Sequence, residues 1–263
     1  MSNLLKLLNE KKEKGEKAFI PYIMVGEDSL ERTYKDILFL EKEGATLIEL
    51  GIPFSDPASD GTVIQESGIK ALKNGINVHK VFELISKIRE VSEVPLVIMS
   101  YINPIFKFGL EEFFKRSSQL SVQGVILPDV PIEEFSFIEK YIKKYEIAYV
   151  PLYSPTTPLE RIKDLCEVGS GFLYVVTSLG VTGEKEIDKK NLGDSLAKIR
   201  ENSTLPIMAG FGISSKEDVK EIKQYSDGVI VGSKIIKLLR GDGYAEISEL
   251  IKAAREWVWI KII

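Results

Sequence analysis

Residues 46–61 read TLIELGIPFSDPASDG, an apolar run that carries one glutamate and ends in a loop rich in glycine, proline, serine and aspartate. Side chains alternate along a strand, so Leu47, Glu49 and Gly51 share one face. A run this apolar predicts a fully buried strand, where an ionised carboxylate is costly unless it is paired or protonated. Burial should raise the pKa of Glu49 towards neutrality, which suits a group that exchanges protons. The alternative is a structural glutamate that is salt-bridged across a core.

The unit of strand and helix recurs along the chain. Eight apolar runs predict strands at residues 18–26, 46–51, 95–101, 124–128, 148–152, 171–177, 205–210 and 227–232. Helical patterns follow a short amphipathic helix within residues 1–17, at residues 28–44, 65–74, 79–91, 111–119, 132–144, 159–168, 192–201, 214–224 and 244–259. Near-continuous apolar strands are typical of a parallel sheet covered on both faces. Eight such units in this length predict an α/β fold, a single-domain (β/α)₈ TIM barrel over residues 1–263 with an additional N-terminal helix. A doubly wound open sheet is the main alternative.

Composition narrows the partners and the compartment. The formal net charge of −4 offers no basic footprint for nucleic acid. The single cysteine, Cys166, excludes an intramolecular disulfide, and together with the sole histidine, His79, it cannot supply an ordinary zinc site. The first 17 residues contain no apolar run long enough for a signal peptide or a membrane span. We therefore expect a cytoplasmic protein without a metal, a membrane or a nucleic-acid partner.

Three glycine-bearing turns follow the last three predicted strands. They are residues 180–183 (GVTG), residues 210–212 (GFG) and the pair Gly232-Ser233. Glycine lets backbone N–H groups approach an anion closely, and helix N-termini add partial positive charge. Ser214 and Glu217 have capping-box spacing, so a helix should begin directly after the second turn. Each turn by itself would be only a tight turn, but together they predict a phosphate site, and the long loops after Gly51 and after residue 177 are candidate lids.

The missing residue types restrict the chemistry. A small phosphate ester with Glu49 as acid/base suggests carbon–carbon cleavage or proton-transfer isomerisation. No lysine lies at the end of a predicted strand, which argues against an aldolase that works through a Schiff base. A metal-dependent aldolase with histidine ligands needs several histidines, and the chain has one. A phosphosugar isomerase would need a second acid/base across the pocket, and none is obvious. Cleavage here must rest on carboxylates and on a substrate that supplies its own electron sink.

Residues 48–65, IELGIPFSDPASDGTVIQ, closely resemble the signature of the tryptophan synthase alpha subunit family. The resemblance continues in family order through PYIMVG at 21–26, YINPIF at 101–106, LPDVP at 127–131, GVTG at 180–183, GFGI at 210–213 and VGS at 231–233. It implies a barrel that cleaves indole-3-glycerol phosphate to indole and glyceraldehyde 3-phosphate in tryptophan biosynthesis, without a cofactor of its own. It also implies an alpha2-beta2 heterotetramer, in which indole passes to a pyridoxal-phosphate beta subunit. Indole, protonated at C3, would be the electron sink.

The resemblance also assigns roles to residues. Glu49 is the acid/base, Asp60 accepts from the indole N–H and stabilises the charge that develops on the ring, and Tyr174 lies beside the glutamate. The substrate-binding set comprises a lid residue that closes onto Asp60, four phosphate ligands and three walls of the indole pocket: Thr182; Gly183, Gly212, Gly232 and Ser233; and Tyr22, Met99 and Phe211. Plain barrel core is the alternative for the three pocket walls.

Four residues keep family positions near the loops that face the partner: Asp56, Tyr101, Asn103 and Asp129. As bare residues Asp56 and Asn103 would simply be turn formers. The chain departs from many family members at Thr62, where they have proline, and at Ser178, where they have arginine, so loop stiffness and lid closure are the properties in question.

Two further functions stay open at this point. A stand-alone lyase that releases free indole would keep every catalytic residue and need no partner. A non-catalytic phosphate-binding subunit that only activates a partner is the other, and the pairing of Glu49 with Asp60 argues against it because phosphate binding needs neither.

Overall fold

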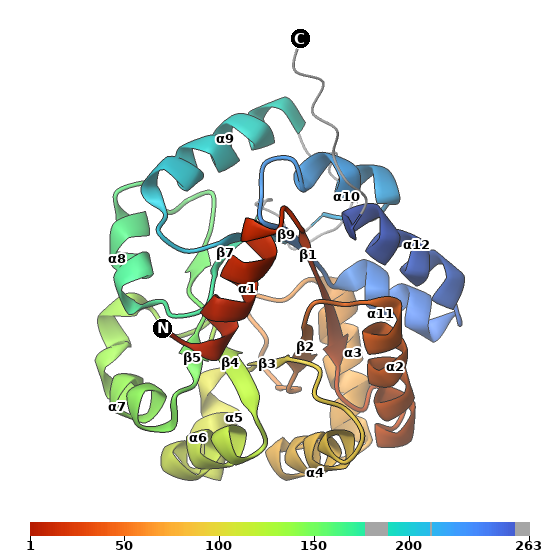
Figure 1. Cartoon of the computed structure of the whole chain (residues 1–263). Helices are drawn as coiled ribbons and strands as arrows, with labels where there is room; N and C mark the ends of the chain where they lie inside the picture. The colour runs from red at the N-terminus through yellow and green to blue at the C-terminus, as the bar shows by residue number, and fades with distance from the viewer. Residues whose placement is uncertain (177–188, 211, 256–263) are drawn as a thin grey trace.

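A ring of parallel strands inside a ring of helices makes up the computed structural model, which describes residues 1–176, 189–210 and 212–255 (Figure 1). The strands are β1 (Ala18–Met24), β2 (Ile48–Gly51), β3 (Leu96–Met99), β4 (Val122–Ile126), β5 (Ala148–Tyr149), β6 (Leu152–Tyr153), β7 (Leu173–Val176), β8 (Ile207–Gly210) and β9 (Gly228–Val231). They pair in the order β5-β4-β3-β2-β1-β9-β8-β7-β6, and every pairing is parallel. The prediction of a TIM barrel is confirmed.

One predicted strand, at residues 148–152, is divided into β5 and β6. Val150 donates its N–H to the carbonyl of Val125 on β4 at 3.0 Å, whereas Pro151 accepts from the N–H of Tyr174 on β7 at 3.0 Å. Proline has no N–H to donate, so regular pairing breaks at this point. Because β5 and β6 are consecutive pieces of chain, they close the ring at the two ends of the strand order.

The helices cover the outside of the barrel (Figure 1). They are α1 (Asn3–Glu13), α2 (Leu30–Glu43), α3 (Thr62–Lys73), α4 (Val78–Arg89), α5 (Ile102–Phe108), α6 (Leu110–Gln119), α7 (Ser136–Tyr145), α8 (Arg161–Val168), α9 (Lys189–Asn202), α10 (Lys216–Ile222), α11 (Ser233–Arg240) and α12 (Tyr244–Arg255), with a 3₁₀ turn at Ile132–Glu134 before α7. Each buries an apolar stripe: in α4 the buried side chains include Val78, Val81, Phe82 and Ile85, which follow helical spacing. Ser29 is the N-cap of α2, and its side chain accepts from the N–H of Arg32.

Two helices, α5 and α11, were not predicted. The pair Asn103-Pro104 suggests a turn, yet proline is tolerated in the first turn of a helix, and α5 begins at Ile102. α11 is short and follows directly on the last strand. Both begin at the strand ends where the site was expected.

The predicted N-terminal helix, α1, lies across one end of the barrel (Figure 1). Its Leu4 and Leu8 are buried in the inner core formed by the inward-facing residues of the strands. Space for Leu4 comes from Gly124 and Gly171, where an added Cβ would lie 3.2 and 2.9 Å from the Cδ2 atom of Leu4. With this end filled, a substrate has to enter the barrel from the opposite end, where the strands finish.

The last described helix is held by a buried cation. Lys223 is 2% exposed, and its ammonium donates to the carbonyl oxygens of Ala253 and Ala254 at 2.6 and 3.4 Å. Positive charge at a helix C-terminus satisfies carbonyls that have no partner within the helix. The helix predicted at 244–259 is observed as α12, and residues 256–259 lie outside the described residues. None of the described helices is long and apolar enough to cross a membrane.

Candidate active site

Glu49 lies on the inward face of β2 and is 1% exposed. Both of its carboxylate oxygens are buried and have no hydrogen-bond partner. Burial, followed by the charge of Asp60, raises the pKa of Glu49 to about 8. Among residues 1–176, 189–210 and 212–255 no cation pairs with Glu49, which argues against a structural salt bridge. At neutral pH Glu49 is therefore mostly protonated and can donate a proton.

Asp60 ends the loop after β2 and is 6% exposed. Burial raises the pKa of this carboxyl to about 6, against a hydrogen bond from Tyr101 that lowers it. Gln65 on α3 stabilises this loop, because its side-chain amide donates a hydrogen bond to the backbone carbonyl of Asp60 at 2.8 Å. Two carboxyls thus share one buried region, with different proton affinities, as acid/base pairs in enzymes do.

Tyr101 is a site residue to which the sequence assigned a different place. It was expected to face a partner, but it is 5% exposed and its hydroxyl is hydrogen-bonded to the Asp60 carboxylate. The same hydroxyl accepts from the N–H of Ser59 at 2.9 Å. Burial, then Asp60, raises the pKa of Tyr101 to about 12. Nothing in the local sequence signals this contact, because β3 and the loop after β2 are joined only by the fold.

Two more tyrosines line the inner face near the acids. Tyr174 on β7 is 7% exposed, and Tyr22 on β1 is 4% exposed and pairs in register with Glu49. Burial is the main cause that raises the pKa of each phenol well above its usual range, and Glu49 and Asp60 add to both. Gly210 leaves room for Tyr174, since an added Cβ would lie 2.9 Å from its hydroxyl oxygen. The structure therefore brings Tyr22, Glu49, Asp60 and Tyr174 together.

Besides Tyr22, the predicted pocket wall that the structure describes is Met99, the last residue of β3. It is partly buried and packs both against the inner core and against the larger hydrophobic core that the strands and the surrounding helices share. Its neighbour in register is Gly51, at the end of β2. Met99 therefore lies at the barrel mouth, as a pocket wall would, and part of its surface is also ordinary core.

The predicted phosphate ligands Gly212, Gly232 and Ser233 follow β8 and β9. Gly212 has a φ of +73°, a conformation that favours glycine. Gly232 is the N-cap of α11, Ser233 is the first residue of that helix, and no side chain caps the helix there. The first N–H groups of α11 therefore point at the barrel mouth without a capping side chain, as an anion site requires.

The capping box of α10 differs by one residue from the prediction. It is formed by Ser215 and Asp218, not by Ser214 and Glu217, because Asp218 reaches back to the N–H groups of Ser214 and Ser215. The helix still begins directly after the glycine turn. Thr182, Gly183, Phe211 and the departure at Ser178 lie outside the described residues.

The predicted partner-facing residues follow the ends of neighbouring strands: Asp56 and Asp129 lie on loops, Tyr101 is the N-cap of α5 and Asn103 lies in its first turn. Asp129 accepts from the N–H of Ile102 with both oxygens, at 3.0 and 3.1 Å, and so caps α5. Asp56 and Asn103 are exposed, as turn formers would also be. Nearby, Phe106 on α5 is 51% exposed and stacks on Phe137, with ring centroids 5.6 Å apart.

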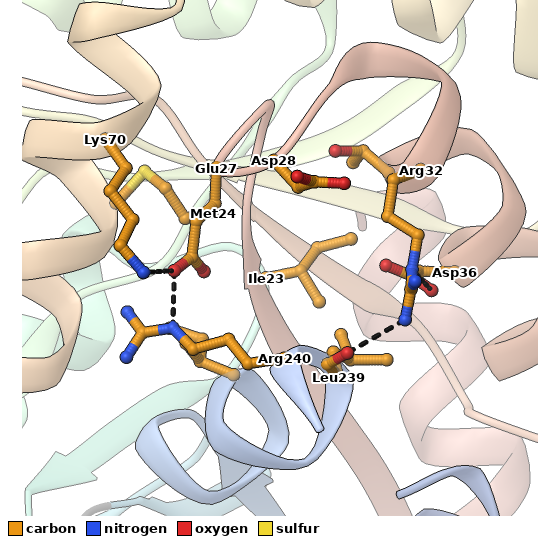
Figure 2. Close-up of a pocket in the computed structure, with 11 residues that line it drawn as sticks. Ile23, Met24, Glu27, Asp28, Arg32, Asp36, Lys70, Leu239 and Arg240 are labelled. Carbon is orange, nitrogen blue, oxygen red and sulfur yellow. Dashed lines mark hydrogen bonds and ion pairs between the residues drawn. The ribbon is translucent and has the colours of Figure 1, made fainter. Parts of the chain in front are cut away.

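A separate cavity of about 480 Å³ lies between α2, α3 and α11, and no predicted site residue lines it (Figure 2). Glu27 is its centre: Arg240 donates to it at 2.5 Å, Lys70 at 3.3 Å and Ser67 at 2.6 Å. Arg32 is likewise paired, with Asp36 and Asp242. The ions satisfy one another, so this cavity is part of the framework. No group of three or more potential metal ligands occurs among residues 1–176, 189–210 and 212–255.

Comparisons with known proteins agree on one family. The family model described as "Tryptophan synthase alpha chain" matches residues 8–257. A tryptophan synthase alpha chain of Bacillus cereus is 43% identical over 244 residues, which cover 93% of this chain and 95% of that protein. The structure of tryptophan synthase subunit alpha from Legionella pneumophila is similar with a TM-score of 0.88 and 30% identity, over 97% of this chain and 98% of that one. A chain of the tryptophan synthase a2b2 complex from Pyrococcus furiosus is similar with a TM-score of 0.81 and 34% identity, over 92% and 98%.

Proposed function

The chain belongs to the tryptophan synthase alpha chain family, and from this membership we propose that Glu49, Asp60 and Tyr174 form its catalytic site. Its activity is the family's lyase reaction, the cleavage of indole-3-glycerol phosphate to indole and glyceraldehyde 3-phosphate in tryptophan biosynthesis. The observation that carries the assignment is Glu49, a carboxyl buried at a strand end without a hydrogen-bond partner.

Glu49 serves as both acid and base. In the protonated form that prevails at neutral pH, it gives its proton to C3 of the indole ring, which becomes a 3H-indole cation. The resulting carboxylate then removes the proton of the chain hydroxyl next to the ring. As that O–H electron pair forms the aldehyde, the bond from the chain to C3 breaks and its electrons restore the aromatic ring. One proton is given and one is taken back, so Glu49 ends in its starting form.

Asp60 stabilises the cation that this proton transfer creates. Its carboxylate accepts from the indole N–H, in a buried region where charge interactions are stronger than in water. The hydrogen bond from Tyr101 lowers the pKa of Asp60 and so favours the ionised form that this role needs. Tyr174 supplies a phenol beside Glu49, and the burial of this group keeps it protonated.

The phosphate group binds at the ends of β8 and β9. Gly212, Gly232 and Ser233 supply backbone N–H groups, and the N-terminus of α11 adds partial positive charge. Tyr22 and Met99 form walls for the indole ring. The phosphate fixes the substrate at a distance from the reacting bond, so binding energy from this remote group positions the indole against Glu49.

The partner is a tryptophan synthase beta subunit, as in the a2b2 complex of the Pyrococcus furiosus relative. The contact face includes Asp56, Asn103 and the exposed ring of Phe106, which stacks on the half-buried ring of Phe137. Exposed apolar rings of this kind mark protein interaction sites. Because the family is biosynthetic and the chain has a single cysteine, we place its action in the cytoplasm.

The test is release of glyceraldehyde 3-phosphate from indole-3-glycerol phosphate by the wild type and by Glu49→Gln, each with and without a beta subunit. We expect slow release by the wild type that rises with the partner, and a loss of at least about 100-fold in the variant. Fast release that the partner does not change would show a stand-alone lyase. A variant as active as the wild type would refute the role of Glu49, and no release under any condition would leave a phosphate-binding activator subunit.

A further inference from the structure

Tyr22 carries a hydroxyl that the role of an apolar pocket wall does not use. On β1 the inward-facing series runs Ala18, Ile20, Tyr22, and the first two of these belong to the inner core. Tyr22 is the next position towards the barrel mouth, and it pairs in register with Glu49 on β2. A phenylalanine would fill the same place with the same ring, so the hydroxyl needs its own explanation.

Glycine positions on both neighbouring strands show where the phenol lies. A Cβ added at Gly232, in the phosphate site, would lie 3.7 Å from Cβ and 3.8 Å from Cδ1 of Tyr22. A Cβ added at Gly51, at the end of β2, would overlap the hydroxyl oxygen of Tyr22 and lie 2.6 Å from its Cζ. The side chain therefore begins beside the phosphate site and ends over the end of the strand that carries Glu49. Gly51 leaves the space that the hydroxyl occupies.

The hydroxyl of Tyr22 has no hydrogen bond to any residue that the structure describes, although the residue is 4% exposed. Near it, the two carboxylate oxygens of Glu49 are buried and have no hydrogen-bond partner. A buried polar group without a partner is costly, and proteins satisfy nearly all such groups. Polar atoms left unpaired on one concave face are the groups that a bound ligand would satisfy.

We propose that the hydroxyl of Tyr22 hydrogen-bonds a hydroxyl group of the three-carbon chain of the substrate, and that this contact selects a hydroxylated chain between the indole ring and the phosphate. The proposal rests on the proposed function, which sets the phosphate at Gly232 and the indole ring near Glu49. The chain that joins these two groups then runs along the phenol of Tyr22. A phenol both donates and accepts, so it suits an alcohol, which does the same.

The charges around Tyr22 favour the neutral phenol that this contact needs. Burial raises its pKa well above the usual range, and Asp60, Glu49, Tyr174 and Tyr101 all act in the same direction. Such a group stays a hydrogen-bond donor throughout the pH range of the enzyme. A site built to bond a substrate hydroxyl rejects an analogue that lacks it, because the protein group is then left unpaired.

The experiment compares Tyr22→Phe with the wild type in the complex with a beta subunit. One measurement is kcat/KM for indole-3-glycerol phosphate. The other is the affinity for an analogue in which a propyl phosphate replaces the glycerol phosphate, so that both chain hydroxyls are absent. We expect Tyr22→Phe to lower kcat/KM about 10- to 100-fold and to leave the affinity for the analogue within about twofold. Tyr149→Phe, which removes the buried hydroxyl that bonds the carbonyl of Val130, is the matched control and should change neither value.

Each other outcome has a definite meaning. If Tyr22→Phe changes neither value, the hydroxyl has no role and the proposal is wrong. If it weakens both equally, the phenol contacts the phosphate or the ring, which also overturns the proposal. Calorimetric binding of indole-3-glycerol phosphate in a Glu49→Gln background, with and without Tyr22→Phe, gives a readout that needs no turnover. A failure of the proposed function would show separately, as a wild type that does not cleave or a Glu49→Gln variant that does.

Discussion

Glu49 should make the protein less stable as the pH rises, and Glu49→Gln should remove this dependence. In the folded chain the pKa of Glu49 is about 8, against 4.5 for a solvated glutamate. The folded state therefore holds the proton more tightly than the unfolded state does. Stability from this group is complete below the unfolded pKa and is lost as the pH rises through the folded pKa.

The size of the effect follows from these two values. Ionising the group in the unfolded chain while it stays protonated in the folded one lowers the free energy of unfolding by about 1 kcal/mol at pH 5, about 3 kcal/mol at pH 7 and about 5 kcal/mol at pH 9. Glutamine does not titrate. The stability of Glu49→Gln relative to the wild type should therefore rise by about 4 kcal/mol between pH 5 and pH 9.

The assay is urea unfolding of both proteins at pH 5, 7 and 9, followed by circular dichroism, with equal slopes required for the comparison. Glu90→Gln, the same substitution at an exposed position, is the matched control. Any constant offset caused by the amide cancels, because only the change with pH is used. A difference for Glu49→Gln that is flat from pH 5 to pH 9 would refute the buried, unpaired state of this carboxyl.

Three further results are expected. A plot of kcat/KM against pH should be bell-shaped, with half-maximal values near pH 6 and pH 8, because Asp60 must be ionised and Glu49 protonated. A profile that is flat from pH 5 to pH 9 would contradict these roles. Gly51→Ala should lower kcat/KM at least about 10-fold, because the added methyl displaces the phenol of Tyr22 that packs against Gly51. Gly241→Ala is the control and should leave kcat/KM unchanged, because its Cβ would lie no closer than 3.7 Å to another atom. Equal activities of the two variants would refute the packing of Tyr22 on Gly51. Leu4→Ala should lower the free energy of unfolding by about 2–5 kcal/mol in urea titrations, because it opens a cavity in the plug of the barrel, and a loss under about 1 kcal/mol would contradict its burial.

The barrel was predictable from the sequence because its strands are buried on both faces. Such strands read as continuous apolar runs, and their ends differ from the prediction by only a few residues: the run expected at 124–128 is β4, Val122–Ile126. Pairing beyond the apolar run itself is decided by neighbours. Pro151 divides β5 from β6 because it has no N–H to donate to the adjacent strand. The effect of this missing donor depends on which strands pair there, and the local sequence does not show the pairing.

Glu49 could be predicted as the acid/base candidate for the same reason, because a single carboxylate within an apolar run can be recognised from the sequence alone. Tyr101 and Tyr22 show the limit of this reasoning. Tyr101 reaches Asp60 across 41 positions of sequence, and the hydroxyl of Tyr22 lies over Gly51 only because β1 and β2 pair in one particular register. Contacts between loops and the register of paired strands involve residues far apart in the sequence, so no local sequence pattern predicts them.

The divided strand gives the barrel a seam. β5 and β6 each pair over two residues with their neighbours, whereas β2 and β3 pair over four. In the ring this seam lies opposite β1, whose neighbours are the strands of Glu49 and of Gly232. The least cross-linked part of the wall, where local opening costs the least free energy, thus lies across the ring from the strands that carry Glu49 and lead to Gly232, and it adjoins β7, which carries Tyr174. Opening at the seam would therefore leave Glu49 and the phosphate site in place and would move Tyr174 first.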